Sequence, residues 1–474
     1  MSTVSDRVAV FVCSHHAGHL NPILSLVPLF QRNNYQVHFF TAASRKCKIE
    51  ATGATFHVDG PKYQGDIDAA TKEIIRNKFQ CQPTVNAEGG LFFEQILPIT
   101  VAYFEDGLVE RIRALKPSVI ISDVSALWGV LAAKMLQVPL ITSCSCSLMD
   151  SMVPFEYLRG LDFLQKCSSW LQAQYRIRYD PRDSYLNESD FLINWSVRDF
   201  QVAEKKHAPN VFYFGAAMPQ DFTGYLQEQE RQDRESGDSM MKWCDQAKQE
   251  GKKIIYCSLG TVVGQEKWTL TGTEGDMVAD FYKNVFSFLG DKSEYACIVS
   301  IGQNRSIEDM GTIPSNFFVR QRIPQVLLLA AHADAFITHC GNNGVHESLY
   351  TGTPMLCVPV FGDQHPNADT ICRLKLGVQI ASPFAPAPSP NLDHITAENL
   401  CTKLIEVLGD GSIRDACEKY KGMMQKQHEY FHSQAVGDME NYIQNWGVHN
   451  ASEENDHSQE TGAVVQNIKG LMAC

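Results

Sequence analysis

Short runs of apolar residues, rich in valine, isoleucine and phenylalanine, alternate along the chain with longer stretches of helix-like spacing. A strand that is buried on both faces carries apolar residues at successive positions, so this alternation predicts parallel βα units. The first series of predicted strands comprises residues 8–13, 36–41, 118–122, 139–143, 191–195 and 211–214. The second series comprises residues 254–258, 296–300, 316–320, 334–338, 355–360 and 377–381. Two such series predict an α/β protein with two doubly wound, Rossmann-like sheets, each with a crevice at the carboxyl ends of its strands.

One segment between the two series differs in composition. Residues 219–238 are polar, heavily charged and poor in apolar residues, which is typical of a linker. We therefore predict a first domain over residues 1–218 and a second over residues 239–447, facing each other across a binding cleft. Residues 448–474 are predicted to be a polar tail.

Composition and charge narrow the classes of function. The chain has 474 residues, of which 44% are hydrophobic and 20% charged, so it can fill large cores and wholesale disorder is excluded. Its 41 Lys and Arg against 54 Asp and Glu give a formal charge of -13, which disfavours a general binder of nucleic-acid phosphates. An anionic ligand must therefore be held locally, by backbone amides, helix ends and a few polar side chains.

We expect no targeting segment in this sequence. Its polar start runs directly into the first predicted strand, unlike a signal peptide, and no apolar run approaches the ~20 residues that cross a bilayer. The 15 cysteines include no Cys-x-x-Cys pair, and several lie in apolar strands, which indicates free thiols in a reducing compartment. We expect a cytoplasmic protein without a membrane span.

A histidine after the first predicted strand is the first candidate for chemistry. His19 precedes Asn21 and Pro22, which suit the cap and the first position of a helix, so we expect His19 on a turn that faces the crevice. A neutral imidazole can accept a proton near pH 7. A plain surface histidine fits the same local sequence, and His15 and His16 are competing candidates.

A carboxylate follows another predicted strand of the same sheet. Asp123 comes directly after an apolar run, at the edge where His19 is expected. A carboxylate beside an imidazole fixes its tautomer and stabilises the imidazolium once it has taken a proton. From the local sequence alone, Asp123 could equally cap the helix that follows it.

The most specific pattern lies in residues 322–368. A predicted strand ends at His339, and small residues then lead into a helix. Gly341 and Gly344 let backbone amides approach an anion, whose charge is favoured at a helix N-terminus. Glu347 follows on the first turns of that helix, within reach of ribose hydroxyls.

A further predicted strand brings Asp363 and Gln364 to the same edge, where both can accept hydrogen bonds from sugar hydroxyls. A plain βαβ unit would explain any one of these features. Their fixed order over about 40 residues favours a site for a nucleotide and a sugar instead. No G-x-G-x-x-G follows the first strand and no G-x-x-x-x-G-K-[ST] is present, which disfavours dinucleotide dehydrogenases and P-loop proteins.

These residues resemble the family 1 UDP-glycosyltransferases, whose two-domain architecture is called GT-B. The resemblance covers most of the chain and is most specific over residues 322–368, where THCGNNG and the pair Asp363-Gln364 match the family's C-terminal signature. It implies that His19 is the catalytic base and that Asp123 supports it.

The resemblance also implies a set of donor-binding residues. In chain order, the expected set is Gly260, Thr261, Arg322, Ile323, Gln325, His339, Gly341, Asn342, Asn343, Gly344, Glu347, Asp363 and Gln364. Gln325 and Glu347 match ribose contacts, and His339 matches a diphosphate contact. Asn342, Asn343 and Gly344 fall on the family's phosphate-contacting loop. Asp363 and Gln364 match the residues that hold the transferred sugar, while Thr261 is placed near the phosphates.

Two positions depart from the common pattern of the family. Arg322 stands where a tryptophan usually stacks on uracil, although a guanidinium can also stack on a base. Gly344 stands where many plant members carry serine, which is closer to the animal members.

The resemblance implies an inverting transfer of a sugar, with glucose expected, from a UDP-sugar to a hydroxyl group of a small lipophilic acceptor. UDP would leave with the help of His339, loop amides and the helix dipole, without a metal ion or other cofactor. We expect a monomer whose partners are these two substrates and no nucleic acid. Two alternatives stay open: a nucleotide-sugar 2-epimerase of the same architecture, and a catalytically silent protein that binds a UDP-sugar or a lipophile.

Overall fold

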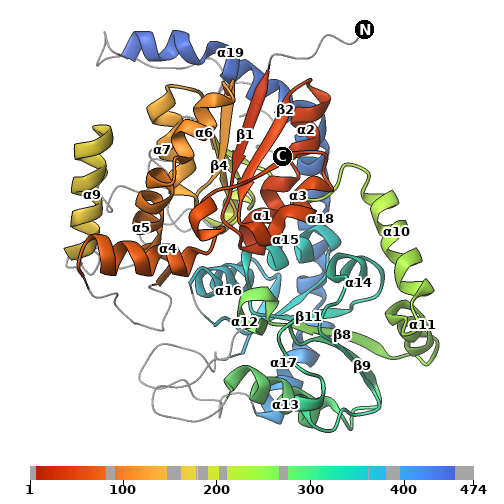
Figure 1. Ribbon diagram of the computed structural model, residues 1–474. Coiled ribbons are helices and arrows are strands. Elements are labelled where there is room, and N and C mark those ends of the chain that lie inside the picture. Colours follow the sequence, from red (N-terminus) through yellow and green to blue (C-terminus); the bar gives the residue numbers. More distant parts are fainter. Residues whose placement is uncertain are drawn as a thin grey trace.

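The computed structural model describes residues 7–81, 91–146, 162–177, 179, 191–201, 211–265, 276–360, 362–380 and 396–453. Within these ranges the chain forms two parallel sheets with helices packed against both (Figure 1). We call the parts built on the two sheets the first and the second domain.

The first sheet has seven strands among the described residues, in the order β3-β2-β1-β4-β5-β6-β7. They are β1 (Val8–Val12), β2 (Gln36–Thr41), β3 (Thr55–Val58), β4 (Val119–Asp123), β5 (Leu140–Cys144), β6 (Phe191–Asn194) and β7 (Val211–Tyr213). The second sheet has six, in the order β10-β9-β8-β11-β12-β13. They are β8 (Lys253–Ser258), β9 (Tyr295–Ser300), β10 (Phe317–Arg320), β11 (Ala335–Thr338), β12 (Met355–Cys357) and β13 (Gly377–Gln379). The predicted fold class is confirmed, and every predicted strand is present.

Helices enclose both sheets. In the first domain they are α1 (Ala17–Leu24), α2 (Val27–Arg32), α3 (Lys46–Glu50), α4 (Ile67–Glu73), α5 (Leu91–Glu105), α6 (Leu108–Ala114), α7 (Leu127–Leu136) and α9 (Asp162–Tyr175). The next group comprises α10 (Phe222–Glu235), α11 (Met240–Gln249), α12 (Gly260–Gln265), α13 (Met277–Leu289), α14 (Gln325–Ala331), α15 (Asn342–Thr351), α16 (Gln364–Arg373) and α17 (Ala397–Gly409). The described chain ends with α18 (Gly411–Tyr430) and α19 (Val436–Glu453).

Strand β1 shows why its apolar residues are consecutive. Val10 and Val12 pack with α4, α5 and α7 on one face of the sheet, while Ala9 and Phe11 pack with α1 and α2 on the other. Successive side chains of a strand point to opposite faces, so both faces need apolar residues. The covered sheet leaves its strand ends as the place where polar side chains can gather.

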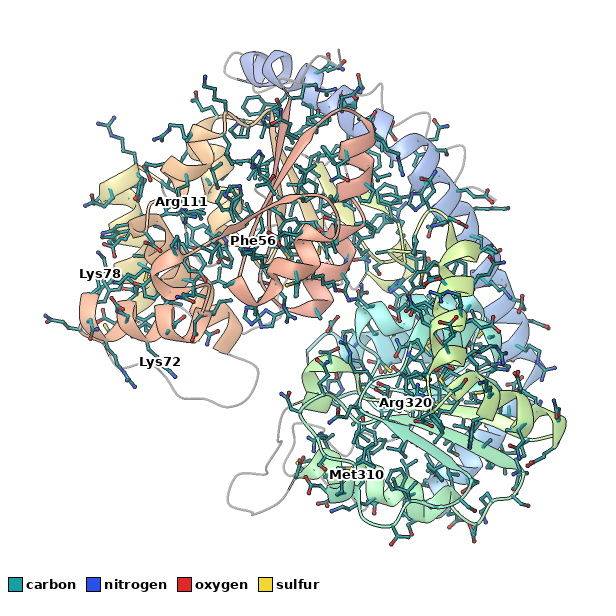
Figure 2. The ribbon with its side chains drawn as sticks, turned by 45° about the vertical axis from the view of Figure 1, so that its right-hand side comes forward. Phe56, Lys72, Lys78, Arg111, Met310 and Arg320 are labelled. Carbon is teal, nitrogen blue, oxygen red and sulfur yellow. The ribbon has the colours of Figure 1, made fainter. Side chains whose placement is uncertain are left out.

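Strand β3 is the one strand of the described residues that the apolar pattern did not predict. Its sequence, TFHV, mixes polar and apolar residues because it lies at the edge of the first sheet, where none of its residues is fully buried. Arg111 on α6 donates a hydrogen bond to the carbonyl of Val58 (2.6 Å) and thereby secures the end of this strand (Figure 2).

The segment predicted to be a linker contains a helix. Over most of residues 219–238 the chain forms α10, which is capped by the Asp221 carboxylate and carries ion pairs such as Arg231–Glu235 and Arg234–Glu230 at i,i+4 spacing. Such pairs stabilise an exposed helix, so the polar composition of this segment is that of an exposed helix between the two domains. Arg320 on β10 also binds Asp233 of α10 (3.0 Å), which ties this helix to the second sheet (Figure 2).

The end of the described chain returns to the first domain. Phe431 and Met439 belong to the apolar cluster that covers one face of the first sheet, and the Tyr442 hydroxyl donates to the carbonyl of Leu140 (3.1 Å). Helix α19 extends to Glu453, so the predicted tail of residues 448–474 begins as helix, and its remainder lies outside the described residues.

Two further features of the described residues are relevant. All 14 of their cysteines are free thiols, as predicted. None of their helices combines the length and the apolar character that crossing a membrane requires.

Candidate active site

His19 lies inside a helix rather than before one. Our prediction that Asn21 caps this helix is wrong, because α1 begins ahead of His19 and contains Pro22. A proline cannot donate to the carbonyl four residues earlier, which here belongs to Gly18. That carbonyl instead accepts a hydrogen bond from the Asn343 side chain of the second domain (3.0 Å), so the helix tolerates the proline.

His19 and Asp123 are brought together as predicted. Asp123 is the last residue of β4, and β1, which precedes α1, is the strand paired with β4. The Nδ1 atom of His19 lies 2.8 Å from Oδ1 of Asp123. The Asp123 side chain is fully buried, whereas that of His19 is 24% exposed, so the imidazole is the accessible member of the pair.

The contact with Asp123 defines which nitrogen of His19 carries the hydrogen. Burial disfavours a proton on His19, but the charge and the hydrogen bond of Asp123, and then the charge of Asp363, raise its pKa above the ordinary value. An ionised carboxylate can only accept, so Nδ1 carries the hydrogen, and in the neutral ring the lone pair is on Nε2. Nε2 is the atom that can take a proton from a substrate.

Two serines around the pair were missed by sequence reasoning. Ser125 donates to Oδ1 of Asp123 through its backbone N–H (2.8 Å) and through its hydroxyl, and the Ser145 hydroxyl lies 3.0 Å from Nδ1 of His19. The spacing Asp-x-Ser is that of an Asx turn and could have identified Ser125. Ser145 carried only the weaker signal of its place just after β5.

In the second domain, His339 is enclosed by two of the predicted glycines. A Cβ atom at Gly260 would come within 2.3 Å of the His339 ring, and one at Gly341 within 2.4 Å. Gly260 also has a left-handed backbone, with φ +74°. Burial lowers the pKa of His339 to about 4, so the imidazole is neutral near pH 7 and can act as a hydrogen-bond donor.

The predicted phosphate loop is the first turn of a helix. Asn342, Asn343 and Gly344 open α15, whereas we expected them to precede it. Asn342 donates to the carbonyl of Trp195 (2.7 Å) and Asn343 to that of Gly18. Both carbonyls belong to the first domain, and Figure 1 shows α1 and α15 side by side between the sheets. The helix N-terminus is thus held against the helix that carries His19.

A buried histidine strengthens this link between the domains. The Nε2 atom of His346, on α15, accepts a hydrogen bond from the backbone N–H of Val197 (3.0 Å). Its Nδ1 atom lies 2.8 Å from the carbonyl of Asn342 on the same helix, which assigns the hydrogen to Nδ1. The sequence places His346 within a helix of mixed polarity and offers no sign of this contact.

Gln325 and Glu347 meet, as their expected roles beside one ribose require. The Gln325 amide donates to the Glu347 carboxylate, and the Tyr256 hydroxyl donates to Oε1 of Gln325 (3.0 Å). Burial raises the pKa of Glu347 to about 7, and the bond from Gln325 opposes this shift. The carboxyl group is thus about half ionised near pH 7, and in either form it keeps an oxygen that can accept a hydrogen bond from a hydroxyl group.

Asp363 and Gln364 stand at the start of α16 but differ in surroundings. Burial raises the pKa of Asp363 to about 6, and the charge of His19 acts in the opposite sense, which places this carboxyl within electrostatic range of the base. Gln364 is only 4% exposed, and its Oε1 accepts the backbone N–H of Val360 (2.8 Å). The Gln364 side-chain oxygen thus stabilises the backbone of the loop that precedes α16.

The remaining predicted residues lie nearer the surface. The side chains of Thr261 and Arg322 are exposed, and Ile323 packs against the apolar cluster beneath α11 and α14. Burial, followed by the charges of Arg45 and Arg322, lowers the pKa of Lys48 in the first domain. Arg322 therefore lies close to the facing domain.

Known proteins share both the sequence pattern and this architecture. The family described as UDP-glucoronosyl and UDP-glucosyl transferase matches residues 302–419. The chain is 24% identical over 388 residues to the NDP-glycosyltransferase YjiC of Bacillus licheniformis, covering 78% of this chain and 84% of that protein. It is 22% identical over 465 residues to the oleandomycin glycosyltransferase of Streptomyces antibioticus, covering 93% and 95%.

Solved structures agree on the fold. The calicheamicin glycosyltransferase CalG4 superposes with a TM-score of 0.67 at 16% identity, covering 92% of this chain and 98% of that one. SnogD from Streptomyces nogalater superposes with a TM-score of 0.59 at 16% identity, covering 93% and 100%. The two sheets therefore belong to a GT-B architecture.

Proposed function

We propose that this chain, a glycosyltransferase of the family 1 type, transfers glucose from UDP-glucose to a hydroxyl group of a small lipophilic acceptor, with inversion at the anomeric carbon. The observation that carries the proposal is the contact of 2.8 Å between His19 and Asp123. This contact supports the assignment of His19 as the base, and the charge of Asp363 in the other domain acts on the same imidazole.

The proposed reaction is a single displacement. Nε2 of His19 accepts the proton of the acceptor hydroxyl while its oxygen attacks the anomeric carbon. The bond from that carbon to the UDP oxygen breaks, and UDP keeps the electron pair. Asp123 stabilises the imidazolium that forms. Attack from the face opposite UDP inverts the configuration.

Stabilisation of the leaving diphosphate is assigned to the second domain. The backbone N–H groups at the start of α15 and the dipole of that helix favour negative charge, and His339 stands beside them as a neutral donor. The proposal includes no metal ion or other cofactor. In it, the hydrogen-bond donors of these residues stabilise the leaving diphosphate.

Asp363 supports glucose as the transferred sugar. Its pKa of about 6 leaves the carboxylate mostly ionised at pH 7.5, where it can accept hydrogen bonds from neutral sugar hydroxyls but repels the carboxylate of glucuronic acid. We expect kcat/KM to be higher for UDP-glucose than for UDP-glucuronic acid.

Both donors should be assayed against a panel of phenols and alcohols, with product detection by mass. Higher kcat/KM with UDP-glucuronic acid would contradict the donor assignment. Reactions without acceptor serve as the control, because a 2-epimerase would consume the UDP-sugar there. A silent binding protein would bind UDP in calorimetric titration and show no turnover with any acceptor.

Arg322 tests how the base of the donor is held. If its guanidinium stacks on uracil, Arg322→Trp should keep or tighten UDP binding, since a base–aromatic stack contributes ~1–3 kcal/mol. We favour stacking, because Arg322 is exposed and directly precedes the segment that leads to Gln325. Calorimetric titration of UDP and of uridine into both proteins measures the effect.

The opposite outcome has its own signature. If Arg322 neutralises phosphate charge instead, Arg322→Trp should weaken UDP binding, flatten its salt dependence and leave uridine binding unchanged. Arg414→Trp, at an arginine on α18 that is exposed like Arg322, is a matched control. One relative is named an NDP-glycosyltransferase, so titrations with other nucleoside diphosphates belong to the same experiment.

A further inference from the structure

A chain of hydroxyl groups leads from the catalytic pair into the first domain. Oδ1 of Asp123 accepts from Nδ1 of His19 (2.8 Å), from the backbone N–H of Ser125 (2.8 Å) and from the Ser125 hydroxyl. The Ser125 Oγ atom lies 2.7 Å from Oγ of Ser14, just beyond β1. Asp123 and both serines are buried, so the chain runs through the interior.

The charge of Asp123 determines which hydroxyl group donates and which accepts in this series of hydrogen bonds. An ionised carboxylate offers no hydrogen, so the single hydroxyl hydrogen of Ser125 points to Asp123. Oγ of Ser125 then accepts from Ser14 at 2.7 Å, and Oγ of Ser14 accepts in turn from Nδ1 of His16 at 3.4 Å. Each of the two serine hydroxyls consequently has one defined orientation.

All described support for the carboxylate arrives at one oxygen. Oδ2 of Asp123 is buried and has no hydrogen-bond partner among the described residues, whereas Oδ1 accepts three hydrogen bonds. Donors to a carboxylate favour its ionised form and fix its orientation. The Ser125 hydroxyl is the one side-chain donor to Oδ1 other than His19 within the described residues.

We propose that Ser125 is a positioning residue for the transfer reaction and acts through Asp123, an inference that rests on the proposed function. Its hydroxyl holds Oδ1 against Nδ1 of His19. The imidazolium that forms during transfer then meets a full negative charge at a fixed distance. The Ser125 hydroxyl contacts Asp123 and Ser14.

Ser125→Ala removes the hydroxyl and leaves the backbone donor in place. We expect kcat to fall about tenfold, the effect of losing one hydrogen bond to a buried charge, with KM for the donor unchanged. The acid limb of the pH dependence of kcat/KM should move to lower pH, because a loosened carboxylate raises the pKa of His19 less.

Two variants accompany this measurement. Ser125→Thr retains the hydroxyl and should restore both kcat and the acid limb. Ser433→Ala removes an exposed hydroxyl that donates to the carbonyl of Glu429 in its own helix, and it should behave as the wild type. If Ser125→Ala does not fold, Ser125→Gly removes the same hydroxyl and is measured instead.

A second readout does not depend on turnover. The titration of the His19 imidazole is followed by NMR on histidine-labelled protein without substrate, with the signal assigned through His19→Gln. A lower pKa in Ser125→Ala, restored in Ser125→Thr, supports the proposal. An unchanged titration or an unchanged acid limb overturns it. Absence of transfer by the wild type would refute the proposed function alone, while the titration would still decide the role of Ser125.

Discussion

His19→Ala is expected to lower kcat by about 10²–10⁴-fold, the usual scale for the loss of a general base. Without the imidazole, no group at this edge takes the acceptor proton as the new bond forms. UDP affinity should change little, because the proposed diphosphate and ribose contacts, including His339 and Glu347, lie in the second domain. Initial rates with UDP-glucose and a phenol, together with calorimetry of UDP, measure both quantities.

The control for this experiment is another histidine change. His332→Ala alters a histidine at the end of α14 that lies 3.5 Å from Asp245 in the second domain, and it should retain wild-type kcat. If His19→Ala keeps activity within about threefold of wild type, His19 is not the base. His15 and His16 would then be the next residues to test.

Asp123→Asn is expected to lower kcat by about 10²–10⁴-fold although the side chain keeps its shape. The amide group can donate to Nδ1 of His19, which would move the ring hydrogen to Nε2, the atom that must accept the proton. Loss of the negative charge also removes the stabilisation of the imidazolium. The effect should appear in kcat, with KM for the donor little changed.

The pH dependence of kcat/KM should shift in a defined direction when Asp123 is changed. In the wild type, kcat/KM should fall as the pH drops through the pKa of His19, which lies above its ordinary value because of Asp123, and the protonated ring is no base. Asp123→Asn lowers that pKa, so the acid limb should move to lower pH. Asp238→Asn, the same substitution at an exposed carboxylate that pairs with Arg320 (3.1 Å), is the control and should leave the acid limb in place.

The double variant tests whether the two residues act as a unit. His19→Ala combined with Asp123→Asn should lose no more activity than His19→Ala alone, because Asp123 has no imidazole left to support. Losses that multiply would show that Asp123 acts independently of His19. Circular dichroism and thermal melting of each variant separate these effects from unfolding.

The strands could be predicted because their environment is uniform. Residues 8–13 and 118–122 lie in a sheet covered on both faces, so apolar side chains are needed at every position whatever the neighbouring strands are. Strand β3 escaped prediction because an edge position relaxes that need. Helix α10 escaped because its stability comes from ion pairs on a polar surface, and such a surface has the composition of a linker.

The start of α1 shows where local rules failed. Asn21 and Pro22 have the preferences of a helix start, and local sequence alone favours that assignment. The helix instead begins before His19. Pro22 has no N–H to donate to the carbonyl of Gly18, and this carbonyl accepts a hydrogen bond from Asn343, 325 residues further along the chain. A contact between domains therefore decided a local boundary.

Local patterns of residues were enough to predict the fold class, the two sheets and candidates such as His19, Asp123 and Glu347, because strand periodicity and strand-end chemistry depend on near neighbours in the chain. Other candidates, such as Gln325 and Asn343, came only from the resemblance to a known family. Only folding decided which candidates meet. His19 and Asp123 are 104 residues apart and come within 2.8 Å because β1 pairs with β4, an order that no local pattern contains. The same pairing of strands brings Ser125 and Ser14 together behind them, since hydrogen bonds between distant segments depend on the arrangement of the whole sheet.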